Sequence, residues 1–249
     1  MLAKGNLVHI LMLCLAILIS GCGSTSSENV KSQGIFARII VKADNNATRV
    51  DTTLTVGSSL GTNLVLSGAD NLKATARGVT QVLTKSKDLF GDVSYTTTFN
   101  FNAPNTEVVV SLERPNDTSC PNSRVLMPDP FSVTAPAPGQ VFTSQSTIPV
   151  NWTPAGPATG TVNVNFTTRC TDANGSAVFR SRTFTSADSG TTSVAAASVL
   201  PTEIYNTAQA CTCDVEVSRT SDGTLDPNYG EGGSITGGQA RTVPIVLQQ

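Results

Sequence analysis

Cysteine thiols offer the most chemistry in this 249-residue sequence, because its only histidine is His9. His9 lies in an N-terminal segment that we expect to be cleaved, which would leave the mature chain without histidine. Such a chain cannot form a Ser-His-Asp or Cys-His triad or supply a histidine metal ligand. Of the six cysteines, Cys14 lies in the same N-terminal segment and needs no role in the mature protein.

That segment has the pattern of an export signal. A basic start over residues 1–4 leads into an apolar run over 7–19. The run is about thirteen residues long, whereas a helix that spans a bilayer needs roughly 20. The pattern therefore predicts a signal that is removed rather than a permanent membrane helix.

The end of the apolar run, Ile19-Ser20-Gly21-Cys22, resembles the lipobox of bacterial lipoproteins, in which an aliphatic residue and two small residues precede a cysteine. The resemblance implies a signal peptide over 1–21 and acylation of the sulfur and amine of Cys22, where each buried lipid CH₂ contributes roughly 0.8 kcal/mol of anchoring. By the same analogy, Gly23 favours the outer membrane in a Gram-negative cell. We expect a lipid-anchored protein of the cell envelope. The alternative is a plain signal peptide with a coincidental cysteine.

The residues after Cys22 are polar and lack periodicity, so we expect 22–34 to be a lipidated, flexible tether. About ten flexible residues span roughly 17–19 Å. That length would lift a folded domain off the lipid surface.

Four cysteines remain: Cys120, Cys170, Cys211 and Cys213. An exported compartment is oxidising, so the even count predicts two disulfides. Bonding Cys211 to Cys213 would be strained on one extended strand, which leaves Cys170 joined to one of them and Cys120 to the other. The apolar strand faces around Cys170 and Cys213 favour Cys170–Cys213 and therefore Cys120–Cys211. A C-x-C metal or redox site is the competing idea, disfavoured by the lack of histidine.

The turn-rich segment 222–238 is a candidate ligand loop. Its acidic and aromatic side chains are Asp222, Asp226, Tyr229 and Glu231. Oxygen-rich loops can bind Ca²⁺, but this one lacks the D-x-D-x-D-G register, and we expect no metal. Nothing in the spacing demands an acid/base pair for sugar hydrolysis, so we expect no catalytic residue. If the segment binds a ligand, these side chains and Tyr205 are the expected contacts.

Strands must position these groups, because period-two alternation dominates after residue 34. Alternate residues Ile35, Ala37, Ile39 and Val41 would share one strand face. About seven such short strands, separated by turns, predict an N-terminal β-sandwich domain over 35–114.

A proline-rich segment over 115–130 follows, with prolines at 115, 121, 128 and 130. Proline cannot donate to a sheet ladder, so this segment predicts a semi-rigid joint between domains. Renewed alternation then predicts a second β-sandwich over 131–249, with a single helical turn near 202–208.

Two passages, Ala135-Pro136-Ala137-Pro138-Gly139-Gln140-Val141-Phe142 and Ile148-Pro149-Val150-Asn151-Trp152, resemble the first two strands of bacterial immunoglobulin-like or fibronectin-III-like envelope modules. The resemblance implies a fold class, all-β with two antiparallel Ig-like sandwiches, and no activity, because such sandwiches host many functions. Trp152 alternates with Ile148 and Val150, so we expect it in the core rather than as a sugar-stacking platform.

The composition narrows the function classes. Net charge is −2 and charged residues make up 14%, which argues against a nucleic-acid binder with a basic face. We expect a non-catalytic envelope protein without a cofactor, attached to the membrane through its lipid. It would act as an interaction, adhesion or scaffold module with an envelope protein or glycan partner. The alternative is a carbohydrate-binding accessory lipoprotein of the periplasm or cell surface.

Overall fold

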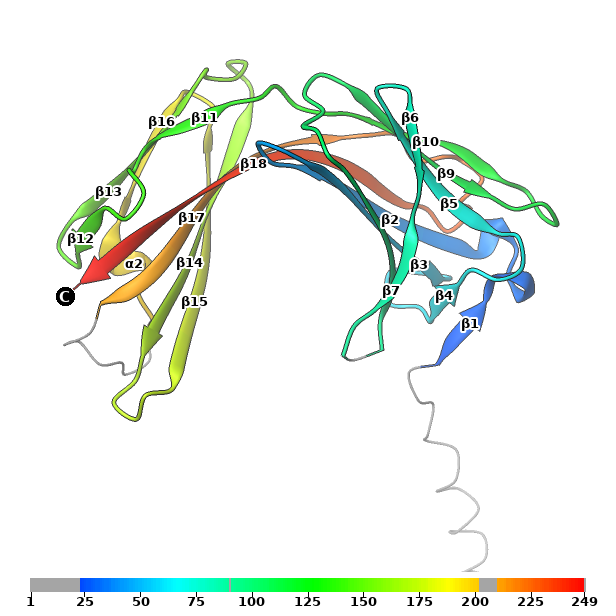
Figure 1. Ribbon diagram of the computed structural model, residues 1–249, viewed down its shortest axis with the longest axis horizontal. Helices are drawn as coiled ribbons and strands as arrows, with labels where there is room; N and C mark the ends of the chain where they lie inside the picture. The colour runs from blue at the N-terminus through cyan, green and yellow to red at the C-terminus, as the bar shows by residue number, and fades with distance from the viewer. Residues whose placement is uncertain (1–22, 90, 202–209, 249) are drawn as a thin grey trace, which may run out of the picture.

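The computed structural model describes residues 23–89, 91–201 and 210–248. Strands dominate this part of the chain and form two lobes that together make an arch (Figure 1). Each lobe encloses its own hydrophobic core between two sheets. The all-β sandwich architecture predicted from the sequence is confirmed.

The first lobe holds the strands nearest the N-terminus. One of its sheets contains β1 (Ser24–Ser26), β4 (Asn63–Val65), β3 (Thr48–Val56), β2 (Ile35–Ala43), β8 (Val93–Phe99) and β7 (Thr84–Lys87). The other contains β10 (Cys120–Leu126), β9 (Glu107–Glu113), β5 (Asn71–Ala76) and β6 (Val79–Val82). The four alternating residues of β2 named above are fully buried, as their periodicity predicts.

The second lobe has the same two-layer plan. One layer contains β15 (Ala177–Ala187), β14 (Thr161–Thr171), β17 (Cys211–Asp222), β18 (Gly233–Gln248) and β12 (Val141–Thr143). The other contains β11 (Ser132–Ala135), β13 (Thr147–Thr153) and β16 (Thr191–Ala195), and the short helix α2 (Ala196–Val199) follows β16. Trp152 is only 2% exposed, so its predicted place in the core is confirmed. The helical turn predicted near 202–208 lies outside the described residues.

Strand β18 runs through both lobes. Residues 233–239 pair in parallel with β2 of the first lobe. β17 pairs with residues 236–247, so its end also lies beside the first lobe, and β12 pairs with residues 246–248 in the second lobe. Ile235 is therefore buried in the first core, and Ile245 in the second. Gly233 allows β18 to approach β2 closely where their pairing begins. Its φ is +130°, and a Cβ at this position would overlap the carbonyl of Ala37. The two lobes share one continuous sheet, so the first lobe includes residues 233–239, which lie outside the predicted range 35–114.

The expected tether over 22–34 is wrong from Ser24 onward. β1 pairs with β4, and two short 3₁₀ turns follow at Ser27–Asn29 and Ser32–Gly34. Ser27 and Ser32 are buried in the first lobe. Cys22 lies outside the described residues.

The expected joint over 115–130 is also partly wrong, because β10 lies within it. β10 pairs with β9 and also forms an isolated antiparallel bridge between Arg124 and Thr224, and its register with β9 shifts between Cys120 and Ser123. Pro121 lies inside that bulge, where the ladder does not require its missing N–H. The described residues include no helix long and apolar enough to cross a membrane.

Candidate functional site

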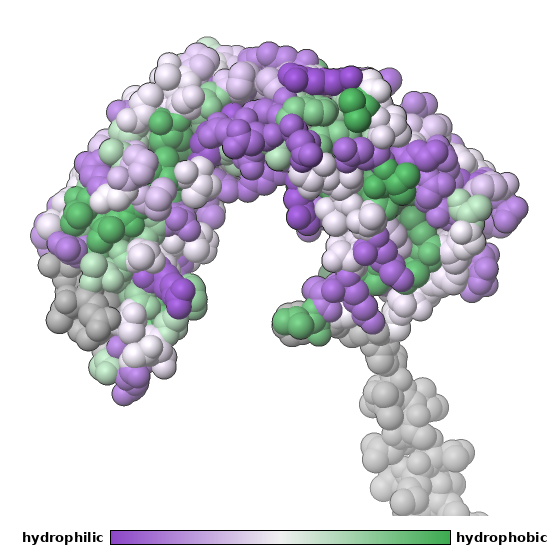
Figure 2. Space-filling model, in the orientation of Figure 1, coloured by the Kyte–Doolittle hydropathy of each residue, from purple (hydrophilic) through white to green (hydrophobic). Residues whose placement is uncertain are grey.

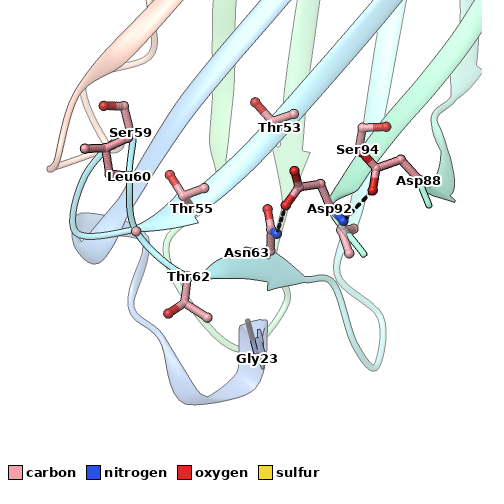
Figure 3. A pocket seen from close by; sticks show the side chains of 12 residues that line it. Gly23, Thr53, Thr55, Ser59, Leu60, Thr62, Asn63, Asp88, Asp92 and Ser94 are labelled. Carbon is pink, nitrogen blue, oxygen red and sulfur yellow. Dashed lines mark hydrogen bonds between the residues drawn. The ribbon is translucent and has the colours of Figure 1, made fainter. Parts of the chain in front are cut away.

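A polar hollow of about 680 Å³ lies at the end of the first lobe (Figure 3). Its wall carries hydroxyl groups from Thr53, Thr55 and Ser94, and Gly23 and Leu60 lie at its border. The side chains come from β3, β4, β8 and two loops, 57–62 and 88–92, that link neighbouring strands. The hollow therefore lies at the end of the lobe where the described chain begins.

Hydrogen bonds fix the acidic side of this hollow. Asn63 donates from Nδ2 to Oδ1 of Asp92 at 2.9 Å, and the backbone N–H of Asp92 donates to Oδ1 of Asp88 at 2.8 Å (Figure 3). Both carboxylates therefore accept hydrogen bonds that stabilise the loop and its contact with β4. Among the residues that the structure describes, no group of three or more potential ligands could hold a metal ion.

A buried arginine, Arg114, clamps the N-terminal segment onto the first lobe. Its guanidinium donates to Oδ2 of Asp70 at 3.0 Å, to Oδ2 of Asp117 at 2.8 Å and to Oγ of Ser32 at 2.9 Å. It also donates to the carbonyl of Ser27 at 2.6 Å. Both ends of residues 27–32 are thus held by one side chain, which explains why this polar segment is ordered.

Desolvation raises the pKa of Asp117, but hydrogen bonds from Thr118 and Ser32 and the charges of Arg114 and Lys31 outweigh it. The net pKa of Asp117 is lowered, so the carboxylate stays ionised beside the guanidinium. The clamp is therefore a charged cluster at neutral pH.

A second buried arginine, Arg219, lies where the lobes meet. Its guanidinium donates to both oxygens of Asp188, at 2.6 and 3.0 Å, and to the carbonyl of Pro154 at 2.6 Å. It stacks over Phe131, 4.8 Å from the ring centroid, and Trp152 donates to Oδ1 of Asp188 at 2.6 Å. This cluster joins β17, which both lobes share, to the first residues of the second core.

The predicted ligand loop does not present its side chains as expected. Tyr229 is 3% exposed and packs in the first core, and Asp226 is 3% exposed. Asp226 accepts the backbone N–H bonds of Asn122 and Asn228 at 2.7 and 2.9 Å, so it caps the turn rather than binding a ligand. Asp222 and Glu231 are exposed. Tyr205 lies outside the described residues.

The favoured disulfide pairing is wrong in detail. The bond joins Cys170 to Cys211, the alternative left open, because these residues lie directly beyond the last β14–β17 pair, Arg169 and Thr212, and their Cα atoms are 4.4 Å apart. Cys213 is two residues further along and faces Thr168, whose hydroxyl donates to its sulfur at 3.2 Å. Cys120 lies in the other core, so the Cys120–Cys211 bond does not form, and Cys120 and Cys213 are free thiols.

Both free thiols are buried, and burial raises the pKa of each. For Cys120 the pKa rises to about 12, because of desolvation first and the nearby Asp226 carboxylate second. Desolvation likewise raises the pKa of Cys213. A thiolate is the reactive form of cysteine, so neither residue is a nucleophile at neutral pH.

An exposed edge strand, β15, ends the shared sheet. Within the described chain, β15 pairs with β14 on one side only. None of its 11 residues is buried, and the Phe179 ring is 62% exposed with the Arg169 guanidinium 5.6 Å from its centroid. The alternation that predicts the second β-sandwich does not predict which strand lies at an edge, because the order in which strands pair is non-local.

No protein-family model and no curated protein matches the chain. Among solved structures, fibronectin(III)-like modules of Clostridium thermocellum CbhA are 13% identical with a TM-score of 0.22, over 86% of this chain and 95% of that chain. The Yersinia pseudotuberculosis adhesin InvE is 12% identical with a TM-score of 0.22, over 85% and 58%. Domains FN1–FN3 of chicken CNTN1 are 12% identical with a TM-score of 0.21, over 86% and 65%. Such low identities and TM-scores support no statement about function.

Proposed function

We propose that this chain is a non-catalytic interaction protein of the cell envelope, anchored by a lipid on Cys22, and that a protein partner pairs with the free edge of β15. The lipid anchor follows from the lipobox-like sequence that ends at Cys22. In a Gram-negative cell the anchor would lie in the outer membrane. The edge of β15 is the observation that carries the interaction role.

An edge strand presents unpaired backbone N–H and C=O groups, which can add a strand from another chain. Natural proteins often protect such edges with lysines, prolines or a very short strand. β15 has 11 residues and contains neither lysine nor proline. Among the described residues no strand pairs with the outer edge of β15, so its backbone groups are available for pairing there.

The side chains near this edge suggest the chemistry of the partner. Arg180 and Arg182 lie on β15, and Arg169 lies on the neighbouring β14 beside exposed Phe179. An extended segment that alternates acidic and apolar residues would match these charges and the aromatic ring. The shared strands β17 and β18 support a scaffold role, because they hold the edge in a fixed position relative to the first lobe.

Site-specific photo-crosslinking in living cells tests the partner. A photoreactive amino acid replaces Thr183, which is exposed on β15, or Thr212, which is exposed on β17 but has paired strands on both sides. We expect position 183, and not position 212, to give a discrete crosslinked product. Equal crosslinking at both positions, or none at 183, would refute binding along this edge.

The anchor has its own test. We expect Cys22→Ser to abolish incorporation of labelled palmitate and to leave unprocessed or mislocalised precursor. A variant that still takes up palmitate would show that Cys22 is not the lipidated residue.

A further inference from the structure

The ordered lobe begins almost directly after the proposed lipid site. Gly23 is the single residue between Cys22 and β1, and consecutive Cα atoms are about 3.8 Å apart. β1 pairs with β4, and the Arg114 clamp holds the turns that follow. A lipid on Cys22 would therefore hold one particular end of the first lobe against the membrane, with no long tether between them.

Strand directions determine which loops lie at that end. β1 and β4 are parallel and both begin there, so β3, antiparallel to β4, ends there. β8 is antiparallel to β3 and begins there, and β7 ends there. The loops 57–62 and 88–92 thus lie at the same end as Gly23. The hollow of Figure 3 agrees, because Gly23, Leu60 and Asp88 all border it.

Each of these two loops carries a fully exposed leucine. Leu60 is 96% exposed and Leu89 is 100% exposed, whereas the other large exposed apolar side chains range from 44% to 62%. Figure 2 shows apolar atoms at the end of this lobe. Leucines on two neighbouring loop tips are costly in water and gain free energy when they enter an apolar phase.

The polar groups around the leucines suit the headgroup region of a bilayer. Hydroxyl groups line the hollow between the loops, and Lys85 and Lys87 are exposed on β7, directly before the acidic loop. The mixture of charges has no strong net sign, so attraction to anionic lipid alone would not orient the lobe. Insertion of apolar side chains beside a covalent lipid would orient the lobe.

We propose that Leu60 and Leu89 form a membrane seat: they enter the interfacial layer of the bilayer that holds the Cys22 lipid. This inference rests on the proposed lipid anchor and adds a defined orientation to it. The arch opens toward the side on which β1 begins (Figure 1). The seat would therefore direct the open side of the arch, and the free ends of both lobes, toward the membrane.

Tryptophan fluorescence on vesicles tests the seat. The mature chain, starting at Cys22, is coupled through the Cys22 thiol to a maleimide lipid in phosphatidylethanolamine–phosphatidylglycerol vesicles with brominated acyl chains. Cys120 and Cys213 are buried, which keeps the maleimide from their thiols in the folded protein, and burial also raises the pKa of each. The variants are Leu60→Trp and Leu89→Trp, with Leu126→Trp as the matched control.

Leu126 is 61% exposed and lies at the end of β10, outside the two loops of the seat. The native Trp152 is buried in the second lobe and gives a constant background. We expect a blue shift and bromine quenching at positions 60 and 89 after coupling, and neither at 126. Absence of quenching at 60 and 89, or equal quenching at all three positions, would overturn the seat.

A second variant tests whether the two leucines act together. Leu89→Asp in the Leu60→Trp chain should reduce quenching at position 60, because one half of the seat is lost. Unchanged quenching would mean that the short spacer alone brings position 60 to the lipid, which would refute a role for Leu89. Chemical coupling also separates this test from the proposed function, since failure of the cell to acylate Cys22 would appear only in the palmitate experiment.

Discussion

Two arginines, Arg114 and Arg219, are buried with their charges satisfied by carboxylates. The side chains of Arg219 and Asp188 are 5% and 2% exposed, and those of Arg114 and Asp70 are 3% and 9% exposed. Removing one partner of a buried pair leaves a charge that water cannot reach. The exposed Arg49–Asp51 pair has no such cost, since solvent takes the place of the lost partner.

Asp188→Asn tests this difference at constant side-chain size. We expect the free energy of unfolding to fall by about 3 kcal/mol, because Arg219 stays buried without its carboxylate. The control Asp51→Asn should lower it by less than about 1 kcal/mol. Denaturant titration followed by Trp152 fluorescence measures both. Equal losses would contradict a special role for the buried pair.

The same variant has a predicted pH dependence. Burial raises the pKa of Asp188, but hydrogen bonds from Arg219 and Trp152 and the charge of Arg219 outweigh it, so the net pKa lies below the ordinary 3.8. The stability from ionised Asp188 is therefore complete above the unfolded pKa and is lost as the pH falls through the folded one. The stability gap between wild type and Asp188→Asn should narrow below about pH 4. A constant gap between pH 7 and pH 3 would contradict this assignment.

The cysteines give a second residue-scale prediction. In a chain that starts at Gly23, Ellman's reagent should detect no thiol in the native state and two after unfolding without reduction, those of Cys120 and Cys213. Cys213→Ser should retain the disulfide, and Cys211→Ser should lose it, as intact mass before and after alkylation will report. Loss of the bond in Cys213→Ser would restore the pairing that the strand faces favoured.

At the scale of single elements, apolar alternation predicts where strands lie in the sequence but not which strands pair with one another. β2 and β13 follow directly from local apolar periodicity, which needs no knowledge of the rest of the chain. The segment 24–34 has no periodicity, and its order depends on Arg114, more than 80 residues away. The turn-forming residues around Tyr229 predict a loop position. Its side chain is instead buried in the first core, whose residues are mostly distant in the sequence. Strand β10 differs from these cases: it pairs with the neighbouring β9, and the prolines in and around it led to the prediction of a joint.

The Arg114 clamp predicts a change in proteolysis. Lys31 lies between the clamped Ser27 and Ser32, and its side chain is 82% exposed. Cleavage at Lys31 requires the backbone to leave the lobe, so wild type should resist trypsin there. Arg114→Gln releases both anchors and should make this bond an early cleavage site.

Lys73→Gln is the matched control for this prediction, because Lys73 forms a partly exposed pair with Glu113 in the same lobe. Its digestion pattern should match that of wild type. N-terminal sequencing of the fragments identifies the cut. Early cleavage at Lys31 in wild type would mean that the segment is a tether after all.

At the scale of the whole molecule, the shared sheet makes the two lobes interdependent. β2 has β3 on one side and the first half of β18 on the other, and β18 comes from the C-terminal end of the chain. The first core also takes Ile235 and Tyr229 from that end. The first lobe therefore depends on residues near the C-terminus and is completed last along the chain.

A fragment over 23–130 tests this interdependence. It contains the expected N-terminal domain but lacks β18, so β2 would become an exposed edge and the core would lose the Ile235 and Tyr229 side chains. We expect no cooperative unfolding transition in circular dichroism. Joining residues 221–240 to the fragment by a short Gly-Ser linker should restore one, since Ser221 hydrogen-bonds the Leu126 carbonyl at 2.6 Å, close to the fragment's end. A fragment that unfolds cooperatively without this addition would show that residues 23–130 fold as an independent domain and that β18 is not required for this folding.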